Sequence, residues 1–245
     1  MTDSAAGVES ASASARGERT VPRVIAVDGS AASGKSTVGR KLAEKLAYPF
    51  LDTGLMYRAV TLAALERGVD PRDKEGLTHL AKSLRLEIGP PSPGSVETCS
   101  ILIDGADVTQ RLRRADVEEA VSLVSRVAGV REALVTQQRE IAGQQPMVMA
   151  GRDIGTVVLP DADLKVYLDA SISERARRRH SEFREHGRTV SRDIVLEDLK
   201  RRDQIDSERV VSPLRPASDA VVINTDGMTS QQVIKRVVQL LGESE

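Results

Sequence analysis

Nine consecutive residues near the start of the chain have the types and spacing of a phosphate-binding loop. They satisfy the pattern G-x-x-x-x-G-K-[ST] with one further hydroxyl residue, and they are Gly29, Ser30, Ala31, Ala32, Ser33, Gly34, Lys35, Ser36 and Thr37. The backbone N–H groups of such a loop turn inward, and the next helix adds its N-terminal N–H groups and its dipole. Lys35 would bring positive charge to the β- and γ-phosphates of a nucleoside triphosphate, and the Ser36 hydroxyl could ligate Mg²⁺.

The segments on either side of this phosphate loop (residues 29–37) fit the same chemistry. Residues 23–28 (RVIAVD) form a short apolar run, as expected of a strand buried on both faces of a parallel sheet. Val38, Leu42 and Leu46 recur at four-residue spacing, which predicts an amphipathic helix. Gly, Ser and Ala are common in loops, so a chance match is the alternative, but the flanking elements favour nucleotide binding. The motif alone does not distinguish a kinase from a GTPase or a motor ATPase.

Two pairs of polar side chains follow other apolar runs of the chain. Thr53 and Arg58 come after residues 48–51, and Arg152 and Asp153 come after the run MVMA. Ligands collect at the carboxyl ends of parallel strands, so we expect these side chains beside the phosphate loop, where arginine can hold a phosphate in a bidentate manner. The alternatives are a turn that only caps the next helix and a loop salt bridge between Arg152 and Asp153.

A third set of charged residues lies on a predicted helix near residue 200. Arg202, Asp206 and Arg209 are spaced i, i+4 and i+7, so they share one helical face, and they continue a stripe begun by Val195 and Leu199. An ion pair between Arg202 and Asp206 on a solvated helix is the usual explanation of this spacing. The alternating charges could instead present donors and an acceptor to a sugar or a base.

An arginine-dense helix is the fourth candidate. Its arginines and those just after it are Arg175, Arg177, Arg178, Arg179, Arg184 and Arg188. A solvated helix balanced by neighbouring glutamates is the alternative. Phosphoryl transfer between two anions, however, needs cations around the transferring group and exclusion of water, and a mobile arginine-rich lid over about residues 175–190 would supply both.

The chain alternates short apolar runs with amphipathic segments. The further runs are residues 48–51, 147–150, 164–168 and 220–224. Such alternation predicts an α/β fold with a central parallel sheet of about five strands flanked by helices. Ser171 with Glu174, and Thr229 with Gln232, fit capping boxes at the starts of two helices.

One region departs from this alternation. From about residue 84 to residue 109 the sequence indicates short strands with turns, including residues 90–94 (PPSPG) and the dipeptide Asp104-Gly105. We therefore expect a small antiparallel insert.

Composition narrows the classes of protein. A formal net charge of −1 over 245 residues argues against a general nucleic-acid-binding surface. Cys99 is the only cysteine, which supports neither secretion nor a zinc site. No apolar stretch approaches the length of a membrane span. Residues 1–20 lack the features of a signal peptide, so we expect a disordered tail, one domain over residues 21–245, and a soluble, cytoplasmic protein.

Taken together, these motifs resemble those of the bacterial cytidylate kinases, within the nucleoside monophosphate kinase family. The similarity runs from about residue 24 to residue 241 and includes IAVDG…SGKST, LDTG–MYRA, GVREAL, GRDIGTVV–PDA–K–YLDA and RRD–D–R–V–PL. The resemblance implies transfer of the γ-phosphate of ATP, with Mg²⁺, to CMP or dCMP, giving ADP and CDP or dCDP, in pyrimidine nucleotide metabolism. It places the antiparallel insert within a monophosphate-binding region of about residues 60–115.

The resemblance also implies an acceptor site made of three groups of residues. They are Thr53, Arg58 and Arg152 for the phosphate; Ser122, Arg131 and Asp153 for the cytosine, with Arg209 nearby; and Arg202 and Asp206 for the ribose. A carboxylate such as Asp153 suits the N4 amino donor of cytosine and disfavours the O4 acceptor of uracil. We expect the catalytic positive charge to come from Lys35, Arg152, Arg178 and Arg179.

The chain departs from the family pattern at three positions. Ala32 stands where glycine is usual, so we expect an ordinary backbone conformation there; Thr53 replaces a common serine; and Ala150 stands where a carboxylate is frequent. We expect a monomer and direct transfer without a phosphoenzyme. No general base stands out, although Asp153 remains a candidate.

Two other functions stay open at the level of sequence. A kinase for UMP, AMP or a hydroxylated metabolite would share the phosphate loop and the lid. A P-loop ATPase switch would hydrolyse nucleotide without an acceptor, although the base motif N-K-x-D of G domains is not present.

Overall fold

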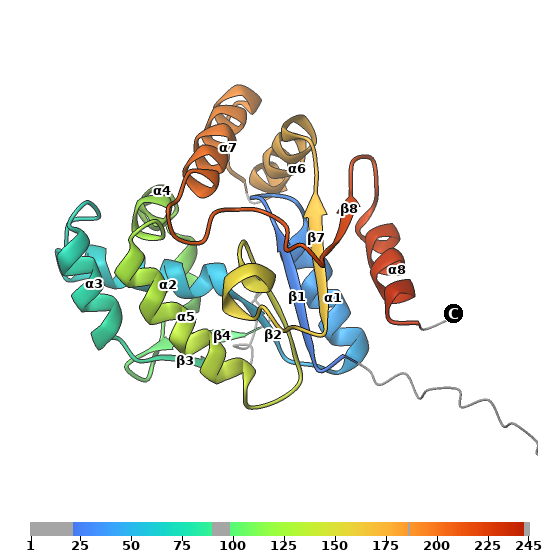
Figure 1. Cartoon of the computed structure of the whole chain (residues 1–245). Helices are drawn as coiled ribbons and strands as arrows, with labels where there is room; N and C mark the ends of the chain where they lie inside the picture. The colour runs from blue at the N-terminus through green and yellow to red at the C-terminus, as the bar shows by residue number, and fades with distance from the viewer. Residues whose placement is uncertain (1–21, 90–98, 186, 243–245) are drawn as a thin grey trace, which may run out of the picture.

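The computed structural model describes residues 22–89, 99–185 and 187–242, and its centre is one parallel sheet. The strand order is β2-β6-β1-β7-β8, and each neighbouring pair is parallel (Figure 1). The strands are β1 (Val24–Gly29), β2 (Phe50–Asp52), β6 (Met147–Gly151), β7 (Leu164–Asp169) and β8 (Val221–Asn224). The predicted fold class and the five predicted apolar runs are thus confirmed. The expected tail and the turn at residues 90–94 lie outside the described residues.

Helices cover both faces of this sheet, which explains why its central strands are apolar throughout. Ile25 and Val27 of β1 pack in one core with α1 (Lys35–Leu46) and α8 (Ser230–Leu240). Ala26, between them, faces the opposite core, which contains side chains of α2 (Thr53–Glu66) and α5 (Ala128–Ala142). Successive side chains of a strand point to opposite faces, so a strand with a core on each side needs a continuous apolar run.

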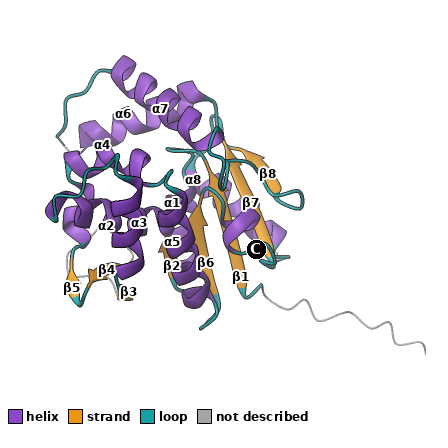
Figure 2. Cartoon of the chain, turned by 60° about the vertical axis from the view of Figure 1, so that its left-hand side comes forward, coloured by secondary structure: helices purple, strands orange, loops and turns teal. Residues whose placement is uncertain are grey.

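The predicted antiparallel insert is present as a second, three-stranded sheet. It consists of β3 (Leu86–Gly89), β4 (Ser100–Ile103) and β5 (Ala106–Asp107), which Figure 2 shows apart from the main sheet. Asp104 and Gly105 join β4 to β5 with φ angles of 51° and 82°. Positive φ at both central residues is the requirement of a tight hairpin turn, so the Asp-Gly signal is confirmed.

Six further helices lie in the described residues. They are α3 (Lys74–Ser83), the short η1 (Thr109–Arg113), α4 (Ala115–Val124), the π-helical η2 (Ile154–Val158), α6 (Ile172–Glu185) and α7 (Arg192–Ser207). Helices α6 and α7 pack against each other above the sheet (Figure 1). Ala176 of α6 and Leu199 of α7 share a small apolar cluster with Ala31 of the phosphate loop. The arginine-rich helix is therefore docked beside that loop.

Hydrogen bonds at two helix starts test the predicted capping boxes. Thr229 and Gln232 form the complete reciprocal box before α8. At Ser171 the structure gives one half of the motif, because the Glu174 backbone N–H donates to the serine Oγ at 3.3 Å.

In the part of the chain that the structure describes, no helix is long and apolar enough to cross a membrane.

Candidate active site

A cavity of about 550 Å³ opens where the carboxyl ends of the main strands meet α4, α5, α6 and α7. It is lined by the phosphate loop from Ala31 onward and by every other residue predicted for ATP binding, acceptor binding or catalysis. Gly29 and Ser30 are not in the lining, and neither are four arginines of the predicted lid, Arg175, Arg177, Arg184 and Arg188. Segments that lie far apart in the chain therefore converge on one site, as the sheet-edge argument predicts.

The donor end of the cavity is the phosphate loop at the start of α1. The Lys35 ammonium is buried and donates to the Ser30 carbonyl oxygen at 3.1 Å. Burial, with repulsion from Arg152 next in importance, lowers the pKa of Lys35 to about 8. The Ser36 hydroxyl donates to the carboxylate of Asp52 at 2.5 Å. Asp52 also caps α2 by accepting from the Gly54 N–H at 3.0 Å, and it is a site residue that the sequence analysis missed.

The backbone of the phosphate loop corrects the expectation for Ala32. Its φ angle is 60°, and that of Gly34 is 95°, so both residues lie in the left-handed half of conformational space. The expectation of an ordinary conformation at Ala32 is wrong. The loop must curve enough to turn its N–H groups inward, and this curvature requires a positive φ whichever residue stands there. For a residue with a Cβ, the left-handed conformation costs about 1–2 kcal/mol.

Asp28, the residue before the loop, connects the donor end to the acceptor end. Its buried carboxylate accepts from the backbone N–H groups of Ile154 and Gly155, both at 2.8 Å. Burial outweighs these hydrogen bonds and raises the pKa of Asp28 to about 6. The two N–H groups follow Arg152 and Asp153 directly in the chain, so Asp28 fixes the loop that presents them. A lone carboxylate at the end of an apolar run was the only sequence signal for this role.

At the acceptor end, arginines and carboxylates from different elements form pairs. Arg152 pairs with Asp206, and Arg131 of α5 pairs with Asp153. The attraction of Asp206 raises the pKa of Arg152. The alternative of an Arg152–Asp153 salt bridge is not what the structure shows, because each of the two has its partner elsewhere.

The predicted Arg202–Asp206 pair is also replaced by other contacts. Arg202 pairs with Asp198 at 2.8 Å, and Asp206 lies 3.4 Å from Arg209 in addition to its contact with Arg152. Asp206 is only 4% exposed, and all of these residues line the cavity. The interpretation of this face as a solvated helix surface is wrong, because α7 turns it toward the site.

The pocket around Arg131 and Asp153 is buried and has unpaired donors. The Arg131 guanidinium lies 5.1 Å from the centre of the Tyr57 ring and donates to the Ser125 carbonyl oxygen at 3.2 Å. Among the described residues, Arg131 Nε and Arg209 Nη2 have no hydrogen-bond partner although both are buried. Buried donors are rarely left unpaired, so these two point to a ligand with acceptor atoms. Ser125, which the sequence analysis missed, lines the pocket beside the predicted Ser122.

Two residues predicted for the acceptor's phosphate lie on α2. The Thr53 hydroxyl donates to the Ala150 carbonyl oxygen at 3.0 Å, which ties the ends of β2 and β6 together. Arg58 donates to the Leu112 carbonyl oxygen at 3.3 Å and lies 3.6 Å from the Glu118 carboxylate. Burial, with repulsion from Arg113 next in importance, lowers the pKa of Arg58 to about 10.

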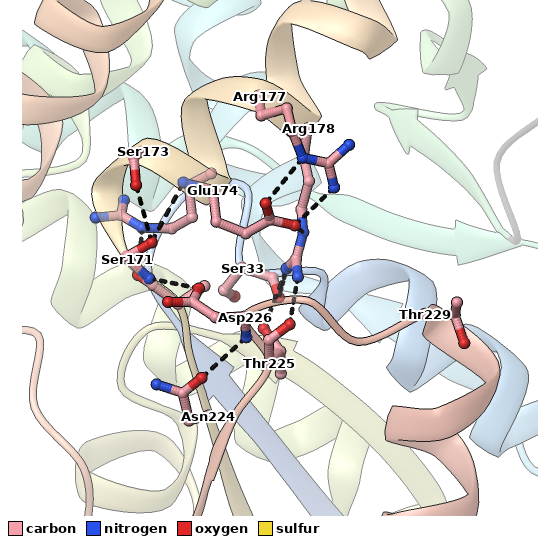
Figure 3. Close-up of polar contacts among 12 residues, drawn as sticks. Ser33, Ser171, Ser173, Glu174, Arg177, Arg178, Asn224, Thr225, Asp226 and Thr229 are labelled. Atoms are coloured by element: carbon pink, nitrogen blue, oxygen red, sulfur yellow. Dashed lines mark hydrogen bonds and ion pairs between the residues drawn. The ribbon is translucent and has the colours of Figure 1, made fainter.

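The arginines of α6 have separate environments, and Arg178 is the one beside the phosphate loop. Figure 3 shows Arg178 contacting the loop and the chain after β8: its guanidinium donates to the carbonyl oxygens of Ser33, at 3.1 Å, and Thr225, at 2.6 Å. Arg177 turns to Glu174 and is more than half exposed. The solvated-surface interpretation therefore holds for Arg177 and not for Arg178.

The other two arginines of this group bridge elements. Arg175 is buried and donates to the Ala31 carbonyl oxygen at 3.3 Å and to Asp203 of α7 at 3.0 Å, so it joins the phosphate loop to α7. Arg179 lines the cavity and pairs with Glu118 of α4. The helix thus brings Arg178 and Arg179 to the site, as predicted.

Several known proteins are similar to this chain in sequence or in structure. The family model described as cytidylate kinase matches residues 25–243. A cytidylate kinase from Herpetosiphon aurantiacus is 46% identical over 91% of this chain and 96% of its own length. One from Geobacillus kaustophilus is 45% identical over 89% of this chain and 96% of its own. Among solved structures, a shikimate kinase from Bacteroides thetaiotaomicron is similar with a TM-score of 0.45 and 14% identity, covering 90% of this chain and 98% of its own. By the family match and these identities, the chain belongs to the cytidylate kinase family.

Proposed function

We propose that this protein is an ATP-dependent cytidylate kinase, which transfers the γ-phosphate of ATP to CMP or dCMP and forms ADP and CDP or dCDP. Membership of the family supports this activity. The observation that carries it is the buried Arg131–Asp153 pair in the same cavity as the phosphate loop. This pair gives the acceptor end a specific hydrogen-bonding pattern, which a simple ATPase would not need.

The pocket around this pair matches the edge of cytosine. The carboxylate of Asp153 can accept from the N4 amino group, while the unpaired Arg131 Nε and Arg209 Nη2 can donate to the O2 and N3 acceptors. Uracil would place its O4 acceptor against the same carboxylate. A buried polar group left facing a group of the same kind loses most of its hydrogen-bond energy, so the pocket should discriminate strongly.

The sugar and phosphate of the acceptor would lie toward the remaining arginines. We assign the phosphate to Arg58, Arg152 and the Thr53 hydroxyl, and the ribose to Arg202 and Asp206. Asp206 has a second role in this arrangement, because its contact with Arg152 holds that guanidinium in place. A bidentate guanidinium fixes the direction of a phosphate as well as its position, which in-line transfer requires.

The donor end holds ATP through the backbone N–H groups of the phosphate loop and through Lys35. Arg178 and Arg179 add positive charge from α6, whose apolar contacts beside the loop help to exclude water from the site. Transfer is direct, since the task of these residues is to position the phosphates and to stabilise charge. No side chain is assigned as a general base.

The oxygen atoms beside Lys35 fit a magnesium ion that arrives with ATP. The Ser36 hydroxyl touches the Asp52 carboxylate, so one hydroxyl and one carboxylate oxygen are in place. The described residues contain no cluster of three potential metal-ligating side chains, which suits Mg²⁺, because this ion keeps water and phosphate oxygens as most of its ligands. Ser36 would hold the ion, with Asp52 next to it, and when bound the ion would neutralise charge on the β- and γ-phosphates.

An acceptor panel tests the proposal. ADP release should be measured by a coupled assay with CMP, dCMP, UMP and AMP as acceptors, and without an acceptor. The proposal predicts the highest kcat/KM for CMP or dCMP and slow ADP release when no acceptor is present. A preference for UMP or AMP would assign another acceptor, and ADP release that does not respond to any acceptor would indicate an ATPase switch.

A further inference from the structure

One buried carboxylate contacts several arginines of the site and has no part in the proposed reaction. Glu118, on α4, is 8% exposed. Its Oε1 contacts Arg179 and lies 3.6 Å from Arg58, and its Oε2 accepts from Arg188 at 3.0 Å. Its backbone carbonyl oxygen accepts from Arg202 at 3.1 Å. The four arginines come from α2, from α6, from the chain after α6 and from α7.

This convergence of positive charge requires an anion at its centre. Arg58 lies near other arginines, whose repulsion adds to burial in lowering its pKa to about 10. Arg179 and Arg188 are also close to each other, since both contact the Glu118 carboxylate, and each guanidinium lies over the Phe183 ring, at 4.5 and 4.4 Å from its centre. Like charges at such separations repel strongly where water is scarce, so the cluster is stable only with a counter-charge.

The geometry of Glu118 is that of a ligand of these arginines. Two carboxylate oxygens meet three guanidiniums, which is the arrangement in which arginines bind a phosphate. Two of its partners, Arg58 and Arg179, are the acceptor and catalytic residues of the proposed reaction. Glu182 also contacts Arg179, at 2.8 Å, and lies 3.9 Å from Arg113 of η1, but its side chain is 40% exposed, whereas Glu118 is buried. Glu118 is therefore the carboxylate that joins the acceptor side of the site to α6.

We propose that Glu118 is an internal stand-in for the acceptor's phosphate: its carboxylate holds Arg58, Arg179 and Arg188, and the phosphate of an incoming acceptor takes its place. The identity of the acceptor in this inference rests on the proposed function. The class of ligand, a phosphate dianion, follows from the arginines. Glu118 acts through these arginines, so it is a positioning residue. Its carboxylate holds the arginine cluster together but competes with the acceptor's phosphate, which weakens acceptor binding. Replacing Glu118 should therefore change KM more than kcat.

The test is equilibrium binding of CMP and of cytidine, without ATP, to the wild type, to Glu118→Gln and to Glu119→Gln. Glutamine removes the competing charge and keeps the size of the side chain. CMP should then bind roughly tenfold more tightly to Glu118→Gln, the scale of one charge-assisted hydrogen bond. Cytidine has no phosphate and should bind both proteins alike. Glu119 is the exposed neighbour on the same helix, so Glu119→Gln should bind both ligands as the wild type does.

Steady-state kinetics add a second readout, since a lower KM for CMP with kcat changed less than about twofold is the expected pattern for Glu118→Gln. Equal or weaker CMP binding would overturn the proposal and make Glu118 a structural counter-charge. An equal gain for cytidine would overturn it as well, because the phosphate would then not be the group that competes.

A probe that contains only phosphate separates this inference from the proposed function. If the wild type binds no CMP, the proposed function fails, and inorganic phosphate then decides the role of Glu118. Phosphate should raise the melting temperature of Glu118→Gln more than that of the wild type, and equal rises would overturn the inference. Should Glu118→Gln not fold, Glu118→Asp replaces it. Its carboxylate is one methylene shorter and reaches the arginines less well, so a smaller gain in phosphate or CMP affinity is expected, and no gain would contradict the proposal.

Discussion

The donor end and the acceptor end of the cavity are built in opposite ways. At the donor end, nine adjacent residues and the start of one helix form a phosphate site largely from backbone, with Lys35 as its main charge. At the acceptor end, arginines and carboxylates from α2, α4, α5, α7 and the loop after β6 meet as ion pairs. A backbone site is specified by local sequence, whereas a network of paired charges is specified by the tertiary structure.

This difference predicts how each end responds to substitution. Removing Lys35, the main charge of the donor end, should affect the reaction more than the fold. Removing one charge of the acceptor end leaves a buried partner unpaired, and that should affect stability and reaction together.

The largest effect is expected for Lys35→Ala. Loss of a positioned cation near the transferring phosphate should lower kcat/KM by roughly 10²–10³-fold, because its charge counts most in the transition state. The melting temperature should change little, since the buried ammonium that is removed has a hydrogen bond to Ser30 but no ion pair among the described residues. Lys45→Ala, an exposed lysine on the same helix, is the control and should keep normal kinetics. Turnover near the wild-type rate in a folded Lys35→Ala protein would contradict the donor-site assignment.

Asp206→Ala, unlike Lys35→Ala, should lower the stability of the fold as well as the rate of the reaction. It leaves Arg152 and Arg209 without their buried partner, which should reduce the free energy of unfolding by roughly 3 kcal/mol, measured by chemical denaturation. The kcat/KM for CMP and dCMP should both fall, and their ratio should move toward one if Asp206 also accepts from the 2′-hydroxyl. Glu197→Ala on the same helix breaks an exposed ion pair with Lys200 and should lower stability by less than about 1 kcal/mol. Equal losses of stability in the two variants would contradict the paired-network description.

The pH dependence of ATP use should report the charge of Lys35. In the free protein its pKa is lowered to about 8, so the ammonium is charged below that pH and neutral above it. The kcat/KM for ATP should therefore fall as pH rises through about 8, while kcat stays level because bound phosphates favour the charged form. Lys35→Arg keeps its charge over this range and should lose the alkaline decline. A kcat/KM for ATP that stays flat through about pH 9 in the wild type would contradict the assignment.

The smallest effect is expected for Ala32→Gly. Relief of the left-handed strain should exceed the added entropy of the unfolded chain and raise the free energy of unfolding by about 0.5–1 kcal/mol. Ala47, which has a φ of 54° at the end of α1, offers a matched case outside the phosphate loop, and Ala47→Gly should give a similar gain. A loss of stability in Ala32→Gly alone would show that the alanine methyl group packs usefully in the loop.

The sequence was sufficient for the parts of the structure that depend on local pattern. Five apolar runs predicted five parallel strands, and Asp104-Gly105 predicted a hairpin turn. The phosphate loop and both arginines of α6 that reach the site were also predicted, because a contiguous motif and a dense cluster leave few alternatives.

Pairing of charges could not be predicted in the same way. The spacing of Arg202 and Asp206 fits an ion pair, but α7 turns that face into the cavity. There Asp206 pairs with Arg152 from the loop after β6, and Arg202 pairs with Asp198 one turn earlier on α7. Asp28 and Glu118 are single carboxylates with no motif around them, and their roles depend on backbone and arginines distant in the chain. At Ala32 the geometry of the loop overrides the preference of the residue.

The measurement that tests the central claim most directly is the ratio of kcat/KM for CMP to that for UMP, in the wild type and in Asp153→Asn. Asp153 is the carboxylate that would accept from N4 of cytosine, and an amide in its place can also donate to O4 of uracil. Any loss from disturbing Arg131 applies to both substrates and cancels in the ratio. The account predicts a strong preference for CMP in the wild type and a ratio at least about tenfold smaller in the variant. An unchanged ratio would show that Asp153 does not read the base, and the proposed acceptor pocket would be wrong.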